Sequence, residues 1–286
     1  MTTQISRVDQ IDGQPPIVHI SDIHGYLEEA RSALEAVGET KRFDPIVVTD
    51  EAGQLHWADN DYILVVNGDV IDRGPANEAC IELVWRLQQE APAGRVRYHL
   101  GNHELAIMLP TFVWWPDAYS TSRSADERQA FLERIRDGDV TAAFAGYRYT
   151  YSHAGQNESF TAAEVNSDLQ AAAGELHAAD GKSDEIQHHV EEAYHRVAGL
   201  GTHGARGAEA GLCWIDFVHL EPSAPPQIVG HSRRDEPVKN GNVVCGNVLR
   251  ANQGSPGGEG VLIETPADLV AVIRQSNGGV SVTQLD

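Results

Sequence analysis

The sequence predicts an α/β fold built in layers. In the first half of the chain, short apolar runs rich in β-branched residues alternate with segments of helical periodicity. In the second half, apolar runs follow one another with only short turns between them, which is typical of β-sheet. The chain has 286 residues, 41% of them hydrophobic, so it can bury a large core.

The individual elements follow from these patterns in order. "PIVHISD" at 16–22 predicts a strand, and the spacing of apolar residues from Leu27 predicts a helix after it. "DYILVVNGD" at 61–69 predicts the next strand, and "NEACIELVWRLQQE" predicts the helix that follows. Two further strands are expected at 95–102 and 146–155. The late strands are expected in "PQIVGHS", "GNVVCGN", "GVLIE" and "LVAVIR".

Three inserts interrupt this alternation. Residues 43–59 predict a hairpin that turns at Glu51–Gly53, whereas 110–140 and 156–210 are long, polar and helical and are expected to form a cap over one edge. No internal repeat and no linker rich in Pro, Gly and Ser divides the chain, so residues 1–286 are predicted to form a single domain. The loop at 252–260 lacks the strand and helix that flank a phosphate-binding glycine loop.

Charge and cysteine content exclude several classes of protein. The formal net charge is −21, and such a surface repels nucleic acid and anionic lipid, so neither is expected as a partner. The chain has no run of eighteen apolar residues and no signal-peptide pattern, so no membrane span is expected. The three cysteines fit no metal-knuckle spacing and predict reduced core residues of a cytoplasmic protein; they are Cys80, Cys213 and Cys245.

Polar side chains gather at the predicted strand ends. They are Asp22 and His24 after the first strand, Asp69, Asp72 and Arg73 after the second, Asn102, His103 and Glu104 after the third, His153 after the fourth, and His231 after "QIVG". The carboxyl ends of strands in an open α/β sheet share one crevice, so these side chains are expected to converge. Any one of them alone would be a packed or capping residue, but five strand ends together favour a metal site. Oxygen and nitrogen donors without a thiolate suit Mn, Fe or Zn and disfavour a closed structural zinc site.

This ordered set resembles the calcineurin-like metallophosphoesterases of the phosphoprotein-phosphatase type. The blocks that carry the resemblance are "DIHG", "GDVIDRG", "GNHE", "SHAG" and "VGHS". Glu104 is typical of that type, and the insert before the second block is similar to the bacterial Shewanella-like phosphatases. The resemblance implies a β-sandwich flanked by helices, the metallophosphoesterase fold, with a helical cap insertion.

The resemblance also implies two divalent metal ions, with Mn²⁺ as the first choice and Fe or Zn as alternatives. Asp69 would bridge them, and the remaining ligands are Asp22 and His24 for the first metal and Asn102, His153 and His231 for the second. Such a pair holds a bridging water, lowers its pKa and clamps both oxygens of an in-line displacement at phosphorus. The resemblance thus implies attack by a metal-bridging hydroxide.

Other residues of the same blocks receive roles in binding and proton transfer. His103 would protonate the leaving alkoxide, and Asp72 would accept the other N–H of its ring. Arg73 would fork onto two phosphoryl oxygens, with Asn102 beside it. A second phosphate-binding arginine of the family is assigned to Arg206, although an ordinary surface arginine is an equal alternative there. The competing candidates are Arg196, Arg233 and Arg234.

The resulting prediction is a dimetal phosphomonoesterase that acts on a serine/threonine phosphoprotein or on a small phosphorylated metabolite or nucleotide. The alternative is a phosphoanhydride hydrolase of the dinucleoside-polyphosphate type. A metal-binding scaffold without catalysis is disfavoured, because His103, Asp72 and Arg73 are all present. Trp114 and Trp115 follow the third block; packing is the favoured interpretation, with a wall of the substrate pocket as the alternative.

Overall fold

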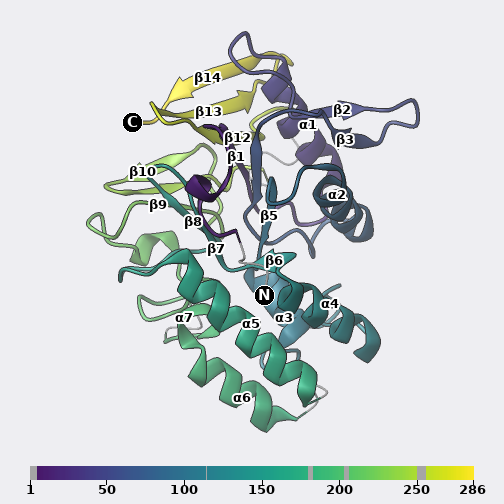
Figure 1. The fold of residues 1–286 in the computed structure, drawn as a ribbon, viewed down its shortest axis with the longest axis vertical. Helices are drawn as coiled ribbons and strands as arrows, with labels where there is room; N and C mark the ends of the chain where they lie inside the picture. The colour runs from purple at the N-terminus through teal and green to yellow at the C-terminus, as the bar shows by residue number, and fades with distance from the viewer. Residues whose placement is uncertain (1–4, 114, 180–182, 203–205, 250–255) are drawn as a thin grey trace.

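Two β-sheets packed face to face form the centre of the molecule (Figure 1). The computed structural model describes residues 5–113, 115–179, 183–202, 206–249 and 256–286. The first sheet has the order β14-β13-β12-β1-β4-β5-β6 and the second the order β10-β11-β9-β8-β7. The predicted layered α/β fold is therefore confirmed.

The first sheet combines parallel and antiparallel pairs. Its strands are β1 (Ile17–Ile20), β4 (Ile63–Val66), β5 (Val96–His99), β6 (Val140–Thr141), β12 (Gly260–Glu264), β13 (Leu269–Arg274) and β14 (Val280–Gln284). Strands β1, β4, β5 and β6 run parallel to one another, whereas β12 pairs antiparallel with β1 and with β13, and β13 pairs antiparallel with β14. Parallel neighbours end at the same edge of the sheet, and this places the loops after β1, β4 and β5 side by side.

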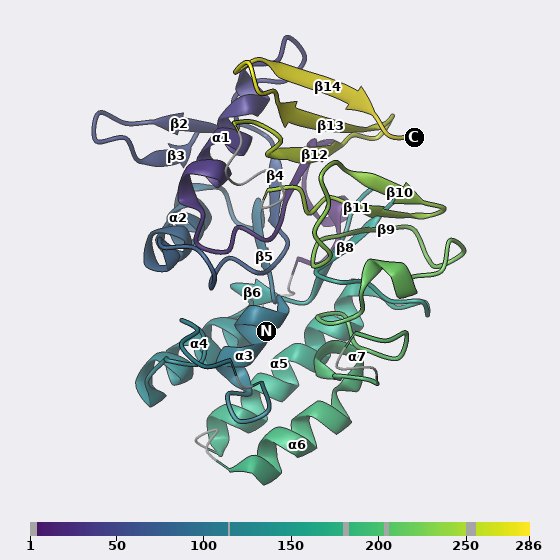
Figure 2. The same cartoon turned by 180° about the vertical axis from the view of Figure 1, so that it is seen from behind.

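Every side chain of β1 and β4 is buried, because this sheet is covered on both faces. Val18 and Leu64 point into the core that includes helices α1 (Leu27–Gly38) and α2 (Asn77–Glu90). Ile17 and Ile63 point into a second core between the sheets, where they meet Tyr151. Figure 2 shows the same layers from behind.

The second sheet holds β7 (Ala143–Ala145), β8 (Thr150–Ser152), β9 (Gln227–Val229), β10 (Val238–Asn240) and β11 (Val243–Cys245). Strands β8, β9 and β11 are parallel, so β8 and β9 also end at one edge. The short helices are η1 (Val8–Gln10) and η2 (Phe217–His219). Together with the first sheet, these strands make the expected β-sandwich.

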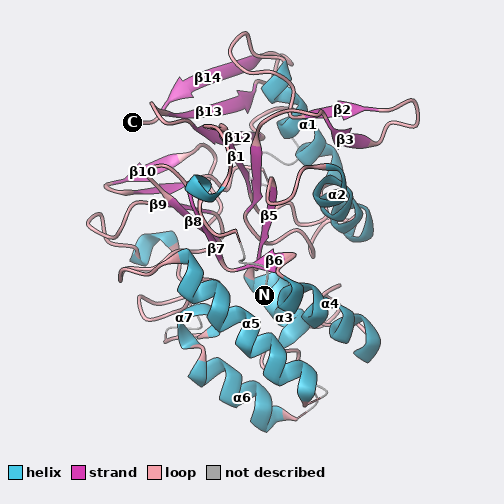
Figure 3. Ribbon diagram, in the orientation of Figure 1, coloured by secondary structure: helices cyan, strands magenta, loops and turns pink. Residues whose placement is uncertain are grey.

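Helices gather at one end of the molecule, next to the edge strands β6 and β7 (Figure 3). They are α3 (Asn102–Met108), α4 (Ala125–Asp137), α5 (Ala162–Ala178), α6 (Asp184–Ala193) and α7 (His195–Ala198). Ser124 and Thr161 start α4 and α5 with reciprocal capping boxes. Helix α4 lies within the segment 110–140 and helices α5 to α7 lie within the segment 156–210, the two segments that the sequence predicted to be helical.

The observed strands are shorter than the sequence predicted. The strand expected at 61–69 ends at Val66, because Gly68 and Asp69 adopt left-handed φ values of 84° and 54°. The strand expected at 95–102 ends at His99, and Asn102 already begins α3. The segment 146–155 contributes only Thr150–Ser152.

Other predictions for separate parts of the chain hold. The hairpin expected at 43–59 is formed by β2 (Val47–Thr49) and β3 (Leu55–Trp57). All three cysteines are buried and unpaired. Within the described ranges, no helix combines the length and apolar character needed to cross a membrane.

Candidate active site

The loops after β1 and β4 run alongside each other and bring three of the predicted ligands together. The backbone N–H of Asp22 donates to the Gly68 carbonyl at 3.0 Å, and that of His24 donates to the Asp69 carbonyl at 2.8 Å. The backbone N–H of His103, in the first turn of α3, donates to Asp69 Oδ1 at 2.9 Å. Asp69 therefore lies between the residues that follow β1 and those that follow β5.

The second sheet supplies the remaining two histidines to the same place. His153 follows β8 directly and His231 follows β9 by one residue. The backbone N–H of His231 donates to Asp22 Oδ2 at 2.9 Å, so a hydrogen bond joins the ends of the two sheets. The structure thus brings together the side chains from all five predicted strand ends.

Most of these positions have a left-handed backbone. Among the described residues, eight non-glycine residues have φ in this region, and six of them belong to the predicted site. The six are Asp22, His24, Asp69, Asp72, Arg73 and His231, with φ from 49° to 71°. Each such residue costs roughly 1–2 kcal/mol. The surrounding fold supports this strain, and it aims the side chains at one point.

Glycines of the motifs permit this close approach of loops. A Cβ at Gly101 would lie 2.3 Å from Asp69 Oδ1 and 2.4 Å from the Asp69 backbone nitrogen. A Cβ at Gly68, which also has left-handed φ, would lie 2.7 Å from His153 Nδ1. Any larger residue would displace Asp69 or His153, so the two glycines are part of the site geometry.

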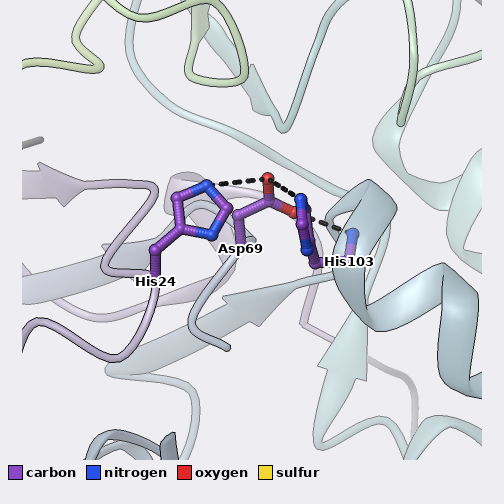
Figure 4. A group of neighbouring side chains, drawn as sticks. All are labelled: His24, Asp69 and His103. Carbon is purple, nitrogen blue, oxygen red and sulfur yellow. Dashed lines mark hydrogen bonds and ion pairs between the residues drawn. The ribbon is translucent and has the colours of Figure 1, made fainter. Parts of the chain in front are cut away.

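Two groups of potential metal ligands share Asp69. The first contains His24, Asp69 and His103 (Figure 4), and the second contains Asp69, His153 and His231. Asp69 Oδ2 lies 3.4 Å from His24 Nε2, whereas Asp69 Oδ1 lies 3.5 Å from His153 Nε2. The two oxygens of one carboxylate therefore face different groups, as a bridging ligand requires.

Backbone carbonyls fix the orientation of two of these histidines. His24 Nδ1 donates to the Ile71 carbonyl at 2.9 Å, and His153 Nδ1 donates to the Asn67 carbonyl at 2.8 Å. Each ring therefore carries a proton on Nδ1 and points its Nε2 into the site. This arrangement is the usual one for imidazoles that bind metal.

The donor set of the site fits divalent cations. Asp22 Oδ1 is buried without a hydrogen-bond partner and lies 3.8 Å from His24 Nε2. Asn102 Oδ1 lies 3.1 Å from His153 Nε2 and 2.9 Å from His231 Nδ1. A buried carboxylate oxygen without a partner is costly, and a cation between these donors would satisfy it.

Burial controls the protonation of the ligand groups. Burial lowers the pKa of His24 to about 3 and the pKa of His231 well below its usual range, so both rings are neutral. Burial raises the pKa of Asp22 to about 7. Burial also acts to lower the pKa of His153, but the neighbouring Asp69 carboxylate outweighs it and raises that pKa to about 9. A metal ion would replace the proton on His153.

His103 is also tied to Asp72, the carboxylate that the sequence predicts as its partner. His103 Nδ1 lies 2.5 Å from Asp72 Oδ2, and its Nε2 faces Arg73 Nη2 at 3.2 Å and Asp69 Oδ2 at 4.0 Å. The side-chain hydrogen bond from His103 counters the effect of burial and holds the pKa of Asp72 below its usual value. The ring therefore offers Nε2, and not Nδ1, to the site.

The structure reveals a supporting residue whose role the sequence did not predict. The Glu104 carboxylate is buried and accepts hydrogen bonds from the backbone N–H groups of Asp69, Val70 and Gly101 at 2.8, 2.9 and 2.9 Å. It thus holds the loop after β4 against the start of α3. Its place in the "GNHE" block was the only sequence signal for it.

Arg206 lies beside the site but does not reach its centre. Its guanidinium is exposed and pairs with Asp216 at 3.1 Å, and Asp216 Oδ1 lies 3.6 Å from His231 Nε2. The assignment of Arg206 to a phosphate stays a prediction. Trp115 is half-buried and stacks on His103, whereas Trp114 lies outside the described residues.

Comparison with known proteins agrees with this geometry. The model of the family described as calcineurin-like phosphoesterase matches residues 15–202, which is more than half of the chain. The chain belongs to this family. The resemblance inferred from the motifs is confirmed, and the buried His/Asp groups suit a metal site.

An individual protein that matches this chain in sequence does so over only part of its length. Shewanella-like protein phosphatase 1 of Plasmodium berghei (strain Anka) is 31% identical over 101 residues, which cover 35% of this chain and 25% of that protein. The match thus spans about a quarter of the length of that curated relative. This relationship supports the distant similarity to Shewanella-like phosphatases that the insert before the second block suggested.

Solved structures share the fold at low sequence identity. The cold-active protein-tyrosine phosphatase of a psychrophilic Shewanella species superposes with a TM-score of 0.64 at 16% identity, over 99% of this chain and 84% of that one. A serine/threonine phosphatase from Saccharomyces cerevisiae gives a TM-score of 0.51 at 13% identity, with the same coverage. These likenesses confirm the metallophosphoesterase fold.

Proposed function

We propose that this enzyme hydrolyses phosphomonoesters, either of serine or threonine in a phosphoprotein or of a small phosphorylated metabolite or nucleotide. The main support for the proposal is the shared carboxylate of Asp69, which faces two groups of potential metal ligands. His103 and Arg73 contact each other beside this carboxylate. This arrangement combines metal binding, phosphate binding and proton transfer within one site.

The proposed cofactor is a pair of divalent ions, Mn²⁺ first, with Fe or Zn as alternatives. Asp22, His24 and Asp69 would hold one ion; Asp69, Asn102, His153 and His231 would hold the other. When bound, the ions would activate a water molecule and neutralise phosphoryl charge. His103 Nε2 lies farther from Asp69 Oδ2 (4.0 Å) than His24 Nε2 does (3.4 Å), and it faces the Arg73 guanidinium at 3.2 Å, so we assign His103 to proton transfer.

The chain's own residues would orient the substrate and protonate the leaving group. The Arg73 guanidinium, exposed at the rim, would donate two hydrogen bonds to the phosphoryl group and release His103 Nε2. Once released by Arg73, His103 Nε2 would take up a proton from solvent and give it to the ester oxygen as the P–O bond breaks, which returns the ring to its neutral form with Nδ1–H toward Asp72. Asp72 would keep the ring oriented throughout. Arg206 would reach the phosphate only after leaving Asp216.

A phosphate-release panel tests the proposal. Enzyme purified after growth with manganese and iron should hold about two metal ions per chain and lose turnover to a chelator. It should release phosphate from a phosphopeptide, sugar phosphate or nucleoside monophosphate faster than from a dinucleoside polyphosphate. The reverse order would support the alternative, a phosphoanhydride hydrolase, and one ion or none would contradict the dimetal site.

Replacing His103 with Asn tests the assignment of the acid. Turnover of an alkyl phosphate should fall by about 100-fold or more, because general acid catalysis contributes on that scale. Turnover of 4-nitrophenyl phosphate should fall much less, because its leaving group needs little protonation. Metal content, measured by elemental analysis, should stay near that of the unmodified enzyme; a parallel loss of metal would make His103 a ligand instead.

A further inference from the structure

One turn between α3 and α4 contacts both members of the His103–Asp72 pair. This turn, residues 115–122, is held together by hydrogen bonds to the Trp115 carbonyl from Thr121 Oγ1 at 2.7 Å and from the Ala118 backbone at 3.2 Å. It belongs to the helical insert and contains none of the motif residues. Its contacts with the site are therefore additional to the family motifs.

The first contact is aromatic. The Trp115 ring stacks on the His103 imidazole, with 4.3 Å between ring centroids and an interplanar angle of 30°. His24 meets the same imidazole edge-on, at 4.7 Å and 84°. The hydrogen bond to Asp72 fixes one ring atom, but it leaves the plane of the ring free to tilt. A stacked indole limits that tilt.

The second contact fixes the carboxylate. Ser120 Oγ donates to Asp72 Oδ2 at 2.7 Å, and the Ser120 backbone N–H donates to Asp72 Oδ1 at 2.9 Å. Both oxygens of Asp72 are thus held from a residue 48 positions away in the sequence. Because Asp72 has left-handed φ of 71°, its side chain starts from a strained backbone that needs such support.

We propose that Trp115 and Ser120 are positioning residues for proton transfer: they hold the His103 ring and its Asp72 partner so that Nε2 points at the leaving oxygen. This inference rests on the proposed role of His103 as the acid. Ser120 acts through Asp72, and Trp115 acts through the ring itself. Neither residue binds metal, so neither should change the metal content.

The variants for the test distinguish the effect of the aromatic ring of Trp115 from the effect of its apolar volume. Trp115→Phe keeps an aromatic face, whereas Trp115→Leu keeps apolar volume without one. Ser120→Ala removes the hydroxyl but leaves the backbone N–H. The first matched control is Trp85→Leu, at a half-buried tryptophan that contacts Tyr98 and Arg134. The second is Ser122→Ala, which removes a hydroxyl that donates to the Tyr119 carbonyl and accepts from Arg123 Nη2.

The readout is kcat for an alkyl phosphate, glycerol 2-phosphate, against 4-nitrophenyl phosphate. Trp115→Leu should lower kcat for the alkyl ester about ten-fold, with KM nearly unchanged and a loss under about two-fold for the nitrophenyl ester. Trp115→Phe should recover most of that loss. Ser120→Ala should lose about three-fold on the alkyl ester alone, and the two controls should match the unmodified enzyme on both esters.

A double variant completes the test. Trp115→Leu added to His103→Asn should cause no further loss on the alkyl ester, because the indole acts only through the imidazole. An equal loss on both esters in Trp115→Leu, or a further loss in the double variant, would overturn this inference. If His103→Asn itself lost activity equally on both esters, the proposed acid would be wrong and the inference would fall with it.

Discussion

The loops at the strand ends and the helical segment α4–α6 are built in opposite ways. The loops place buried carboxylates and imidazoles on left-handed backbone, against glycines that admit no Cβ. The helices begin at Ser124, Thr161 and Ser183, whose hydroxyls accept backbone N–H groups, and they carry most of their charge on exposed faces. The loops at the strand ends have a strained backbone that positions the side chains of the site. Each helix is instead stabilised by local interactions, such as side-chain capping of its first turn.

This difference teaches where a substitution should change activity and where it should change only stability. At the strand ends, one side chain contacts several functional groups at once, as Asp69 contacts both ligand groups. In the helices, a capping side chain hydrogen-bonds only within the first turn of its own helix. Substitutions in the loops should therefore couple stability to metal content, and substitutions in the helices should not.

The largest effect is expected for Asp69→Asn. Asn tolerates the left-handed φ of this position, but it replaces one of the two carboxylate oxygens that face the ligand groups. We expect kcat/KM to fall by more than about 100-fold, since even residues behind metal ligands contribute about 10- to 100-fold. Elemental analysis should show loss of metal.

The matched control is Asp59→Asn, an exposed residue with left-handed φ of 53° outside the site. It should retain metal and activity. If both variants lose activity alike, backbone strain and not metal binding explains the loss.

A Gly→Ala substitution should change the unfolding free energy in opposite directions in the two regions. Gly101→Ala forces a Cβ to within 2.3 Å of Asp69 Oδ1, and we expect a loss of about 1–3 kcal/mol in unfolding free energy together with activity. Gly174→Ala, inside α5 with no atom beyond its own helix backbone within 4 Å of the added Cβ, should gain about 0.5–1 kcal/mol in unfolding free energy with activity unchanged. Denaturant unfolding measures both; a stable, active Gly101→Ala variant would contradict the tight packing described here.

A capping substitution should change stability alone. Thr161 Oγ1 accepts the Glu164 backbone N–H at 3.2 Å at the start of α5, so Thr161→Ala should cost about 1 kcal/mol. Thr161→Ser keeps the hydroxyl and should cost much less. Melting curves and kcat/KM measured on the same samples test the separation; a drop in kcat/KM would show that α5 contributes to the site.

The smallest effect concerns the acidic surface and added salt. A net charge of −21 repels an anionic substrate, and about 0.1 M salt screens that repulsion beyond a Debye length of about 10 Å. Moderate salt should therefore raise kcat/KM about two-fold for a polyphosphate and less for a monoester. If salt lowers kcat/KM for both substrates, arginines near the site attract the substrate, and Arg206, Arg233 and Arg234 are the residues to replace first.

Local patterns determined much of this protein. Helix α2 occupies Asn77–Glu90, the range that its periodicity predicted, because apolar spacing depends on the helix alone. The strand order could not be predicted in the same way, and β14 at the C-terminal edge was not predicted from its short alternating pattern. The residue types at the strand ends sufficed to predict a metal site, because oxygen and nitrogen donors in that order have few other uses.

Only the tertiary structure decided how these donors are held. The Asn67 carbonyl that orients His153 lies 86 positions from it, and Ser120 lies 48 positions from Asp72. Trp115 could be interpreted as packing or as a pocket wall, and the structure places it on the face of His103. The sequence carries the chemistry of each side chain, but contacts between distant positions depend on how the sheets and the insert pack, and that packing is a property of the whole fold.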